Sequence, residues 1–193
     1  VPCRKFPNAQ ELYKEAVRLL EDGKQNNPES IMTMEIAEEK AWEQIEKYLQ
    51  SRNPSELKAL IAHLIRALGY HVSWIAPPEK KYGQVDIVAW GDPIGAKGPR
   101  IIIQIKHKGQ AMTLEGLKSF HSVLGQNDFG LLFSTGGLTN EGKETLATDD
   151  FQKITFWDLD SFVDLWITNY ANLKQEAQNM FPLKAIYFLS LNE

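Results

Sequence analysis

The chain has 193 residues, 43% of them hydrophobic, which is enough for one domain of ordinary size with an extension. No run of about 18 apolar residues could cross a membrane, and no secretory signal is visible. The single cysteine, Cys3, excludes an internal disulfide framework and a cysteine-rich zinc site, which favours a cytoplasmic protein. The chain starts at Val1 rather than at a methionine, so we expect it to be a piece of a longer protein.

The formal net charge of −4 is distributed unevenly along the chain. Residues 1–57 hold 8 Lys and Arg against 11 Asp and Glu, residues 58–126 hold 9 against 4, and residues 127–193 hold 4 against 10. A basic middle segment is compatible with a surface that binds the phosphates of DNA. Solvated faces without any ligand would produce the same counts.

Two helices are expected before residue 53. The first covers residues 8–22, with Asn8 as its N-cap and Gly23 after its end. The second begins at Glu29 or Ser30, ends at Gln50 and has one strongly charged face. We assign these helices no chemistry, so residues 1–52 are interpreted as an α-helical extension that packs on the core or contacts a partner.

A third helix begins at the stretch Asn53-Pro54-Ser55-Glu56 and ends at Gly69. An N-cap residue, a proline at the first helical position and a glutamate at the third form the pattern of a capping box. Capping alone is therefore sufficient to explain Glu56. Residues 71–75 then alternate in polarity as a strand does.

The next strands, residues 85–90 and 101–108, flank a segment rich in glycine and proline and form a predicted hairpin. A hairpin centred near Gly95 places Asp86 opposite Gln104, and the period of two puts Gln104 and Lys106 on one face. Each residue alone would be ordinary polar surface. In strands that are otherwise apolar, a carboxylate, an amide and an ammonium group need a reason, because an unpaired buried charge costs several kcal/mol.

The remaining pattern predicts alternating helices and strands. Thr113 caps a helix that ends near residue 124, and residues 130–134 form a buried strand parallel to the strand before that helix. The turn Thr135-Gly136-Gly137-Leu138-Thr139 leads into a helix at residues 140–147; its backbone N–H groups either bind phosphate or simply form a turn capped by Thr139. A strand at residues 154–157, a helix at 159–170 and an apolar tail that packs back complete the chain.

Four stretches together resemble the Mrr-like restriction endonucleases of the PD-(D/E)xK nuclease superfamily. They are Gly69-Tyr70, Val85-Asp86-Ile87-Val88-Ala89-Trp90, Gln104-Ile105-Lys106 and Phe133-Ser134-Thr135-Gly136-Gly137-Leu138-Thr139. The resemblance covers residues 54–166 and includes the family's own Gln-x-Lys variant of Glu-x-Lys. It implies an α/β fold, namely a restriction-endonuclease-like three-layer sandwich with a mixed sheet in residues 53–170, between the helical extension and a tail at 171–193.

The resemblance also implies metal-assisted hydrolysis of phosphodiester bonds in DNA. Asp86, the side-chain carbonyl of Gln104 and the main-chain carbonyl of Ile105 would bind Mg²⁺, for which Mn²⁺ can substitute, and Lys106 would hold the attacking water. In similar families an acidic residue near the start of the third helix joins the metal, and Glu56 matches that position. Gln84 stands where relatives carry a second acidic residue, so this ligand is absent or supplied from elsewhere.

The expected partner is DNA, with no membrane contact. Lys80, Lys81 and Lys108 are candidates for contacts to backbone phosphate, together with Ser134 and Thr135. Cleavage of both strands favours a homodimer, and a separate or upstream domain would supply specificity. Two alternatives remain open from the sequence: a nuclease-fold module that binds DNA or protein without cutting, and a nuclease that resolves junctions or acts in repair.

Overall fold

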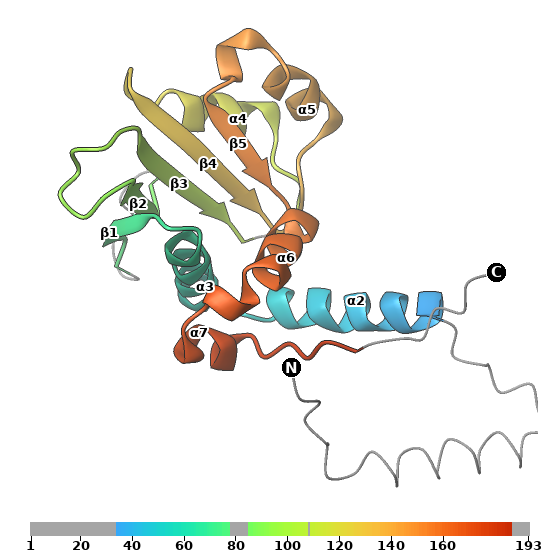
Figure 1. The fold of residues 1–193 in the computed structure, drawn as a ribbon. Coiled ribbons are helices and arrows are strands. Elements are labelled where there is room, and N and C mark those ends of the chain that lie inside the picture. Colours follow the sequence, from blue (N-terminus) through green and yellow to red (C-terminus); the bar gives the residue numbers. More distant parts are fainter. Residues whose placement is uncertain (1–33, 78–84, 108, 187–193) are drawn as a thin grey trace, which may run out of the picture. The chain divides into compact units, whose positions relative to one another are not determined.

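The computed structural model describes residues 34–77, 85–107 and 109–186 (Figure 1). The contacts divide the chain into two compact units, residues 1–43 and residues 44–193. The second unit contains the sheet and the candidate site. The helix expected at residues 8–22 and the candidate contacts Lys80, Lys81 and Lys108 lie outside the described residues.

The described helices and strands follow the predicted order. They are α2 (Met34–Gln50), α3 (Pro54–Ala67), β1 (His71–Ile75), β2 (Ile87–Trp90), β3 (Arg100–Lys106), α4 (Leu114–His121), β4 (Asp128–Ser134), α5 (Asn140–Leu146), β5 (Ile154–Trp157), α6 (Leu159–Thr168) and α7 (Gln175–Met180). Helix α7 and the one-turn helices Asp149–Phe151 and Tyr170–Asn172 were not predicted. None of the helices in the described ranges is both long and apolar enough to cross a membrane.

The described strands form one sheet in the order β1-β2-β3-β4-β5. Strands β1, β2 and β3 are antiparallel, whereas β3, β4 and β5 are parallel, which makes the sheet mixed. Ile87 pairs with Ile103, Val88 with Ile102 and Ala89 with Ile101, which confirms the predicted hairpin. Asp86 directly precedes the paired residues, and its N–H also donates to the carbonyl of Ile103. Gly95, at its centre, has a φ of +70°, a conformation that glycine adopts without a steric penalty.

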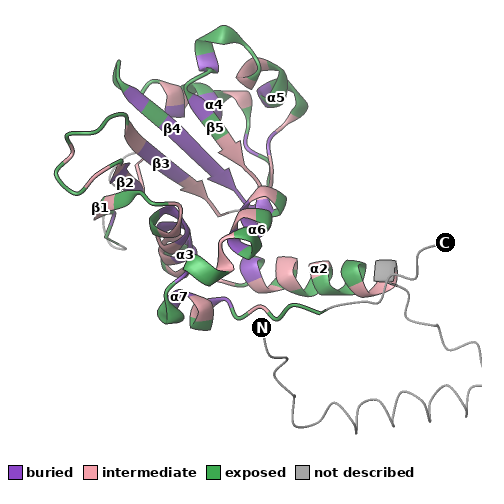
Figure 2. Ribbon diagram, viewed as in Figure 1, coloured by how far each residue is buried: buried purple, intermediate pink, exposed green. Residues whose placement is uncertain are grey.

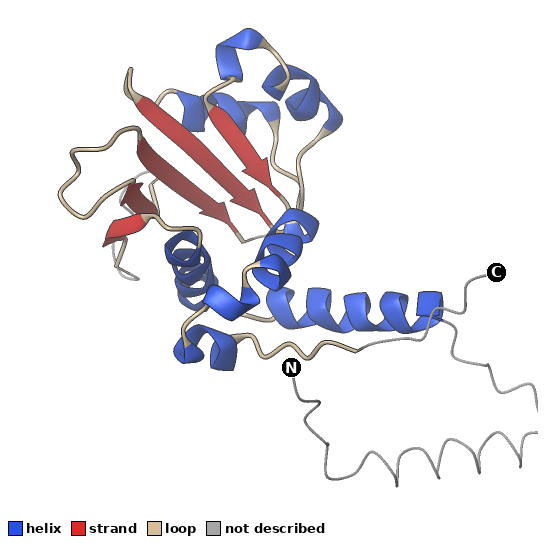
Figure 3. Ribbon diagram, viewed as in Figure 1, coloured by secondary structure: helices blue, strands red, loops and turns tan. Residues whose placement is uncertain are grey.

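Figure 3 shows the strands of the sheet and the helices around it. Alternation along the central strands directs side chains to two opposite faces of the sheet. Ile102 and Leu132 pack into a cluster with Leu117 and Phe120 of α4. On the other face, the ring of Phe133 meets Phe162 of α6 edge-on at 5.6 Å between centroids. Strand β4 is buried along most of its length and β3 in its middle, as Figure 2 shows. The predicted three-layer α/β sandwich is confirmed.

The tail packs onto the α6 side through Phe181, which is 2% exposed. Its ring lies 5.5 Å from that of Trp166 and 5.6 Å from that of Tyr48, at the end of α2. Phe181 thus lies against the α6 side, whereas Ile186 is 77% exposed.

Helix α3 brings its first turns to the start of β2, where Lys58 meets Asp86. Asn53 accepts hydrogen bonds from the N–H groups of Ser55 and Glu56, and Glu56 accepts from the N–H of Asn53, as the capping box predicts. Leu57, Leu60 and Ile61 are fully buried and hold the helix against the sheet. The helix ends before Gly69, whose φ is +91°.

Candidate active site

Asp86 is held in place by hydrogen bonds to the strands on both sides of it. Its N–H donates to the carbonyl of Ile103 at 2.8 Å, and its carbonyl accepts from the N–H of Ala76 at 2.8 Å. Its side-chain Oδ2 accepts from the N–H of Ile105, also at 2.8 Å. The carboxylate therefore has a fixed position beside the Gln104-Ile105-Lys106 motif.

Ile105 turns its main-chain polar groups towards that carboxylate. The N–H and C=O of one strand residue point to the same neighbouring strand, so the carbonyl of Ile105 also faces the β2 side. The neighbouring Lys106 turns its carbonyl to β4, where it accepts from the N–H of Thr135 at 3.1 Å. The main chain of the motif thus joins β4 through Lys106 and turns the carbonyl of Ile105 towards the β2 side.

A cavity of about 250 Å³ opens at this end of the sheet. Its lining residues are Pro54, Lys58, Asp86, Ile105, Lys106 and His107. The structure therefore brings together three of the predicted site residues, Asp86, Ile105 and Lys106. Lys58 and His107 are additional members that the sequence analysis missed.

Gln104 lies in β3 directly before Ile105 but is not one of the residues that line the cavity. It is 2% exposed, and its Oε1 has no hydrogen-bond partner in the described part of the protein. A buried acceptor without a partner costs about 1–3 kcal/mol, so a cation or water is expected to satisfy it when the site is functional.

Lys58 contacts the proposed metal-binding carboxylate directly. Its Nζ lies 3.2 Å from Oδ1 of Asp86 and donates to the carbonyl of Ala76 at 3.2 Å. The charged residue of α3 that reaches the site is thus a lysine. One signal was visible in the sequence: Lys58 precedes the buried Ile61 and Ile65 by three and seven positions, on the core side of the helix.

His107 directly follows the motif and has a buried Nδ1 without a hydrogen-bond partner in the described ranges. Its only sequence signal is the position next to Lys106.

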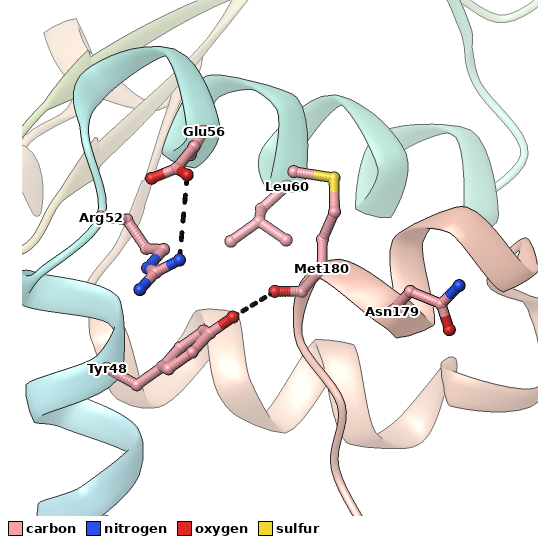
Figure 4. Close-up of a pocket in the computed structure, with 6 residues that line it drawn as sticks. All are labelled: Tyr48, Arg52, Glu56, Leu60, Asn179 and Met180. Atoms are coloured by element: carbon pink, nitrogen blue, oxygen red, sulfur yellow. Dashed lines mark hydrogen bonds and ion pairs between the residues drawn. The ribbon is translucent and has the colours of Figure 1, made fainter.

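Glu56 lines a different cavity, with Tyr48, Arg52, Leu60, Asn179 and Met180 (Figure 4). Its Oε2 accepts from the N–H of Asn53 at 3.0 Å, and its Oε1 lies 3.8 Å from the guanidinium of Arg52. Arg52 in turn stacks over the ring of Tyr48 at 4.3 Å. The structure does not bring Glu56 into the cavity of Asp86, and its contacts are those of a helix cap.

Ser134 and Thr135 are both buried, with 0% and 8% of their surface exposed. The Oγ of Ser134 accepts from the N–H of Gly136 at 3.3 Å, and its carbonyl accepts from the N–H of Gly137 at 3.4 Å. Thr139 caps α5 by accepting from the N–H of Gly142. These N–H groups donate to acceptors within the protein, and the cap at Thr139 matches one of the two alternatives for this turn.

The oxygen donors of the site fit a hard divalent cation. The carboxylate of Asp86, the unpartnered Oε1 of Gln104 and the carbonyl of Ile105 are the donor types that Mg²⁺ and Mn²⁺ prefer. Within the described residues, however, no group of three His, Cys, Asp or Glu side chains comes together. A cation held here would rely on a single carboxylate.

The comparisons with known proteins point to one family. The family model Mrr_cat, described as a restriction endonuclease, matches residues 49–166. No curated protein matches the chain.

Two solved structures share the fold. The MspJI restriction endonuclease, in complex with a 27-mer oligonucleotide, is 15% identical with a TM-score of 0.56, and the match covers 77% of this chain and 36% of that one. The DNA modification-dependent restriction endonuclease AspBHI is 15% identical with a TM-score of 0.53, covering 71% and 38%. This chain therefore spans little more than a third of either enzyme.

Proposed function

Because the chain belongs to the restriction endonuclease family Mrr_cat, we propose that it is a metal-dependent endonuclease that hydrolyses phosphodiester bonds in DNA. The observation that carries the proposal is the 2.8 Å hydrogen bond from Ile105 to Asp86, which fixes the carboxylate beside the Gln-x-Lys motif. The name of AspBHI as a modification-dependent enzyme supports an Mrr-type substrate, which is modified DNA.

Asp86, Gln104 and Ile105 would hold the cation in this proposal. Asp86 supplies the charge, and the amide of Gln104 and the carbonyl of Ile105 supply neutral oxygens. The bound cation supplies Lewis-acid polarisation of the scissile phosphate. Asp86 is positioned for this role before any ligand arrives, because both of its main-chain polar groups are hydrogen-bonded to strands.

Lys106 acts on the reacting groups in our proposal. Its side chain lines the same cavity as Asp86, and its main chain is held by Thr135. An ammonium group there orients the attacking water and offsets negative charge that develops on the phosphate. Such an interaction strengthens in the transition state, so it affects cleavage more than binding.

The proposal includes contacts between DNA phosphates and Lys80, Lys81 and Lys108. Each contact that is removed should lower the slope of log affinity against log salt concentration by about 0.9 on duplex DNA. A homodimer, a separate specificity domain and a cytoplasmic location also belong to the proposal. The dimer is expected because two strands need two active sites, and the location is expected from the single cysteine.

A second candidate function is DNA binding without cleavage. The observation that favours it is the Lys58 ammonium at 3.2 Å from Asp86, because a resident positive charge opposes a metal ion at the same oxygen. A binding module keeps its affinity for DNA without any metal, whereas the enzyme needs Mg²⁺ or Mn²⁺ for turnover.

The decisive experiment incubates the protein with methylated and unmethylated plasmids, with Mg²⁺, Mn²⁺ or EDTA. We expect cleavage with either cation, none with EDTA, and none by an Asp86→Ala variant that keeps its circular dichroism spectrum. Equal binding of DNA in EDTA with no cleavage under any condition would establish the second function instead.

A further inference from the structure

Lys58 has a well-defined place at the candidate site. Its neighbours Leu57 and Ile61 are fully buried, so the helix turn that carries it cannot rotate freely. The Lys58 side chain is 14% exposed, and its ammonium bridges the carbonyl of Ala76 and Oδ1 of Asp86, each at 3.2 Å. Two anchors, one directly after β1 and one directly before β2, hold this ammonium group against the carboxylate.

The charged residues around the cavity oppose the binding of a metal ion. Among the residues that line it, Asp86 is the single carboxylate, whereas Lys58 and Lys106 are both ammonium groups. Gln104 adds an oxygen but no negative charge. A dication that approaches Oδ1 of Asp86 therefore meets a net positive surrounding, and at this partial burial the repulsion is only weakly screened.

We infer that Lys58 is a built-in competitor of the metal ion: it neutralises Asp86 in the metal-free protein and must leave Oδ1 for the cation to bind. The inference rests on the proposed function, in which Asp86 holds the metal. The displaced ammonium then needs another anion, and a phosphate of bound DNA is the group that the proposed reaction brings to the cavity. Metal binding is thus weak without DNA and tighter with it, and by reciprocity the metal tightens DNA binding.

The test measures Mn²⁺ affinity by calorimetry, without DNA, for the wild type and for Lys58→Met. We expect the variant to bind Mn²⁺ about tenfold more tightly or better, because one repelling charge is removed next to the ligand. Lys118→Met, which removes an exposed lysine from α4, is the matched control and should leave the affinity unchanged. Adding Asp86→Asn to Lys58→Met should abolish the gain.

Lys58→Gln separates the charge from the hydrogen bond, since its amide can still donate to the carbonyl of Ala76. Lys58→Gln also serves as a second test variant if Lys58→Met fails to fold. For both variants, the midpoint of thermal unfolding is measured in EDTA and in Mn²⁺. We expect Mn²⁺ to raise the midpoint of Lys58→Gln more than that of the wild type. With a duplex oligonucleotide and Ca²⁺ in place of Mn²⁺, the difference in metal affinity between wild type and variants should narrow.

The outcomes distinguish this inference from the proposed function. Equal Mn²⁺ affinity of the wild type and both Lys58 variants, in a protein that cleaves DNA with Mg²⁺, overturns the role of Lys58 and leaves the nuclease function standing. Absence of cleavage by the wild type, together with absence of Asp86-dependent metal binding in every variant, overturns the proposed function and the inference with it.

Discussion

The polar side chains at the two ends of strand β3 differ in how completely they are hydrogen-bonded. At its first residue, the guanidinium of Arg100 donates to both carboxylate oxygens of Asp128, at 2.9 and 2.7 Å, and the N–H of Gly125 donates to the same carboxylate at 2.8 Å. Near its last residue, Oε1 of Gln104 has no partner in the described part of the protein. Both carboxylate oxygens of Asp128 accept hydrogen bonds at one end, whereas the side-chain oxygen of Gln104 accepts none within the described residues at the other.

This difference distinguishes a pair of residues that stabilises the fold from a group that is available to a ligand. Arg100 and Asp128 are paired residues of β3 and β4, so their ion pair fixes the parallel register of the two central strands. A buried acceptor without a partner, in contrast, reduces stability and is retained where a ligand completes it. We therefore expect substitutions at the Arg100 end to change stability and substitutions at the Lys106 end to change cleavage.

The largest effect is expected for Lys106→Ala. Cleavage of bound DNA in single turnover should fall by about 10²–10³-fold, because a positioned charge at the developing phosphate charge is lost. Affinity for DNA and the midpoint of thermal unfolding should change little, since the Lys106 side chain is only partly buried. Weaker binding with intact single-turnover cleavage would instead assign Lys106 to phosphate contact.

Arg100→Met tests the structural end. The variant leaves Asp128, whose side chain is 7% exposed, with the N–H of Gly125 as its remaining donor. We expect the free energy of unfolding to fall by about 2 kcal/mol, below the range for fully buried pairs because the Arg100 side chain is 41% exposed. Urea unfolding measures this loss, and cleavage at low temperature should be unchanged. A loss of cleavage without a loss of stability would contradict the purely structural role of the Arg100 end.

The same ion pair predicts a pH dependence. The hydrogen bond from Arg100 holds the pKa of Asp128 below its usual value, against the opposing effect of burial. Because the pKa is lower in the folded than in the unfolded state, this stabilisation is present above the unfolded value of about 3.9 and is lost as the pH falls through the folded value. The stability difference between wild type and Arg100→Met should therefore shrink below about pH 4. A constant difference down to pH 2 would mean that Asp128 does not titrate with this pair.

Gln104→Glu tests the other end of β3, at the candidate active site. A second carboxylate beside Asp86 should tighten Mn²⁺ binding by about tenfold, since one negative charge is added to a site that otherwise has a single carboxylate. At least partial cleavage activity should remain. Calorimetry on the wild type and the variant measures the change, and a loss of metal binding would show that residue 104 is not a ligand.

Much of the fold could be predicted because local rules and tertiary packing agree. The capping box at Asn53, the glycine at position 69 and the turn at Gly95 each need one backbone conformation, and the structure has all three. The register of Ile87 with Ile103 followed from the centre of the hairpin alone. Helix α7 was missed because its six residues have one buried member, Ala177, and so give no apolar stripe.

The sequence predicts which site residues meet through strand pairing, but not which residues of a helix reach the site. Asp86, Ile105 and Lys106 meet because register joins them, and register can be derived from a hairpin. Lys58 and Glu56 are two residues apart on one helix, and a rotation of about 200° separates their directions. Which of them faces Asp86 depends on how α3 lies on the sheet, which the helical pattern specifies only through its buried stripe.

The smallest effect is expected for Glu56→Gln, and it tests that last distinction directly. The variant weakens the bond from the N–H of Asn53 to Oε2 and removes the long ion pair with Arg52 at 3.8 Å. We expect a loss of about 0.5–1 kcal/mol in the free energy of unfolding, as for one half of a helix cap, and unchanged cleavage. Asn53→Ala is the matched control: it removes the other half of the same capping box and should likewise reduce stability alone.

If Glu56→Gln instead reduced cleavage strongly at unchanged stability, while Asn53→Ala did not, Glu56 would have to turn from Asn53 towards Asp86 during the reaction. A carboxylate there would join Asp86 as a second negative charge, and the site would no longer depend on one carboxylate.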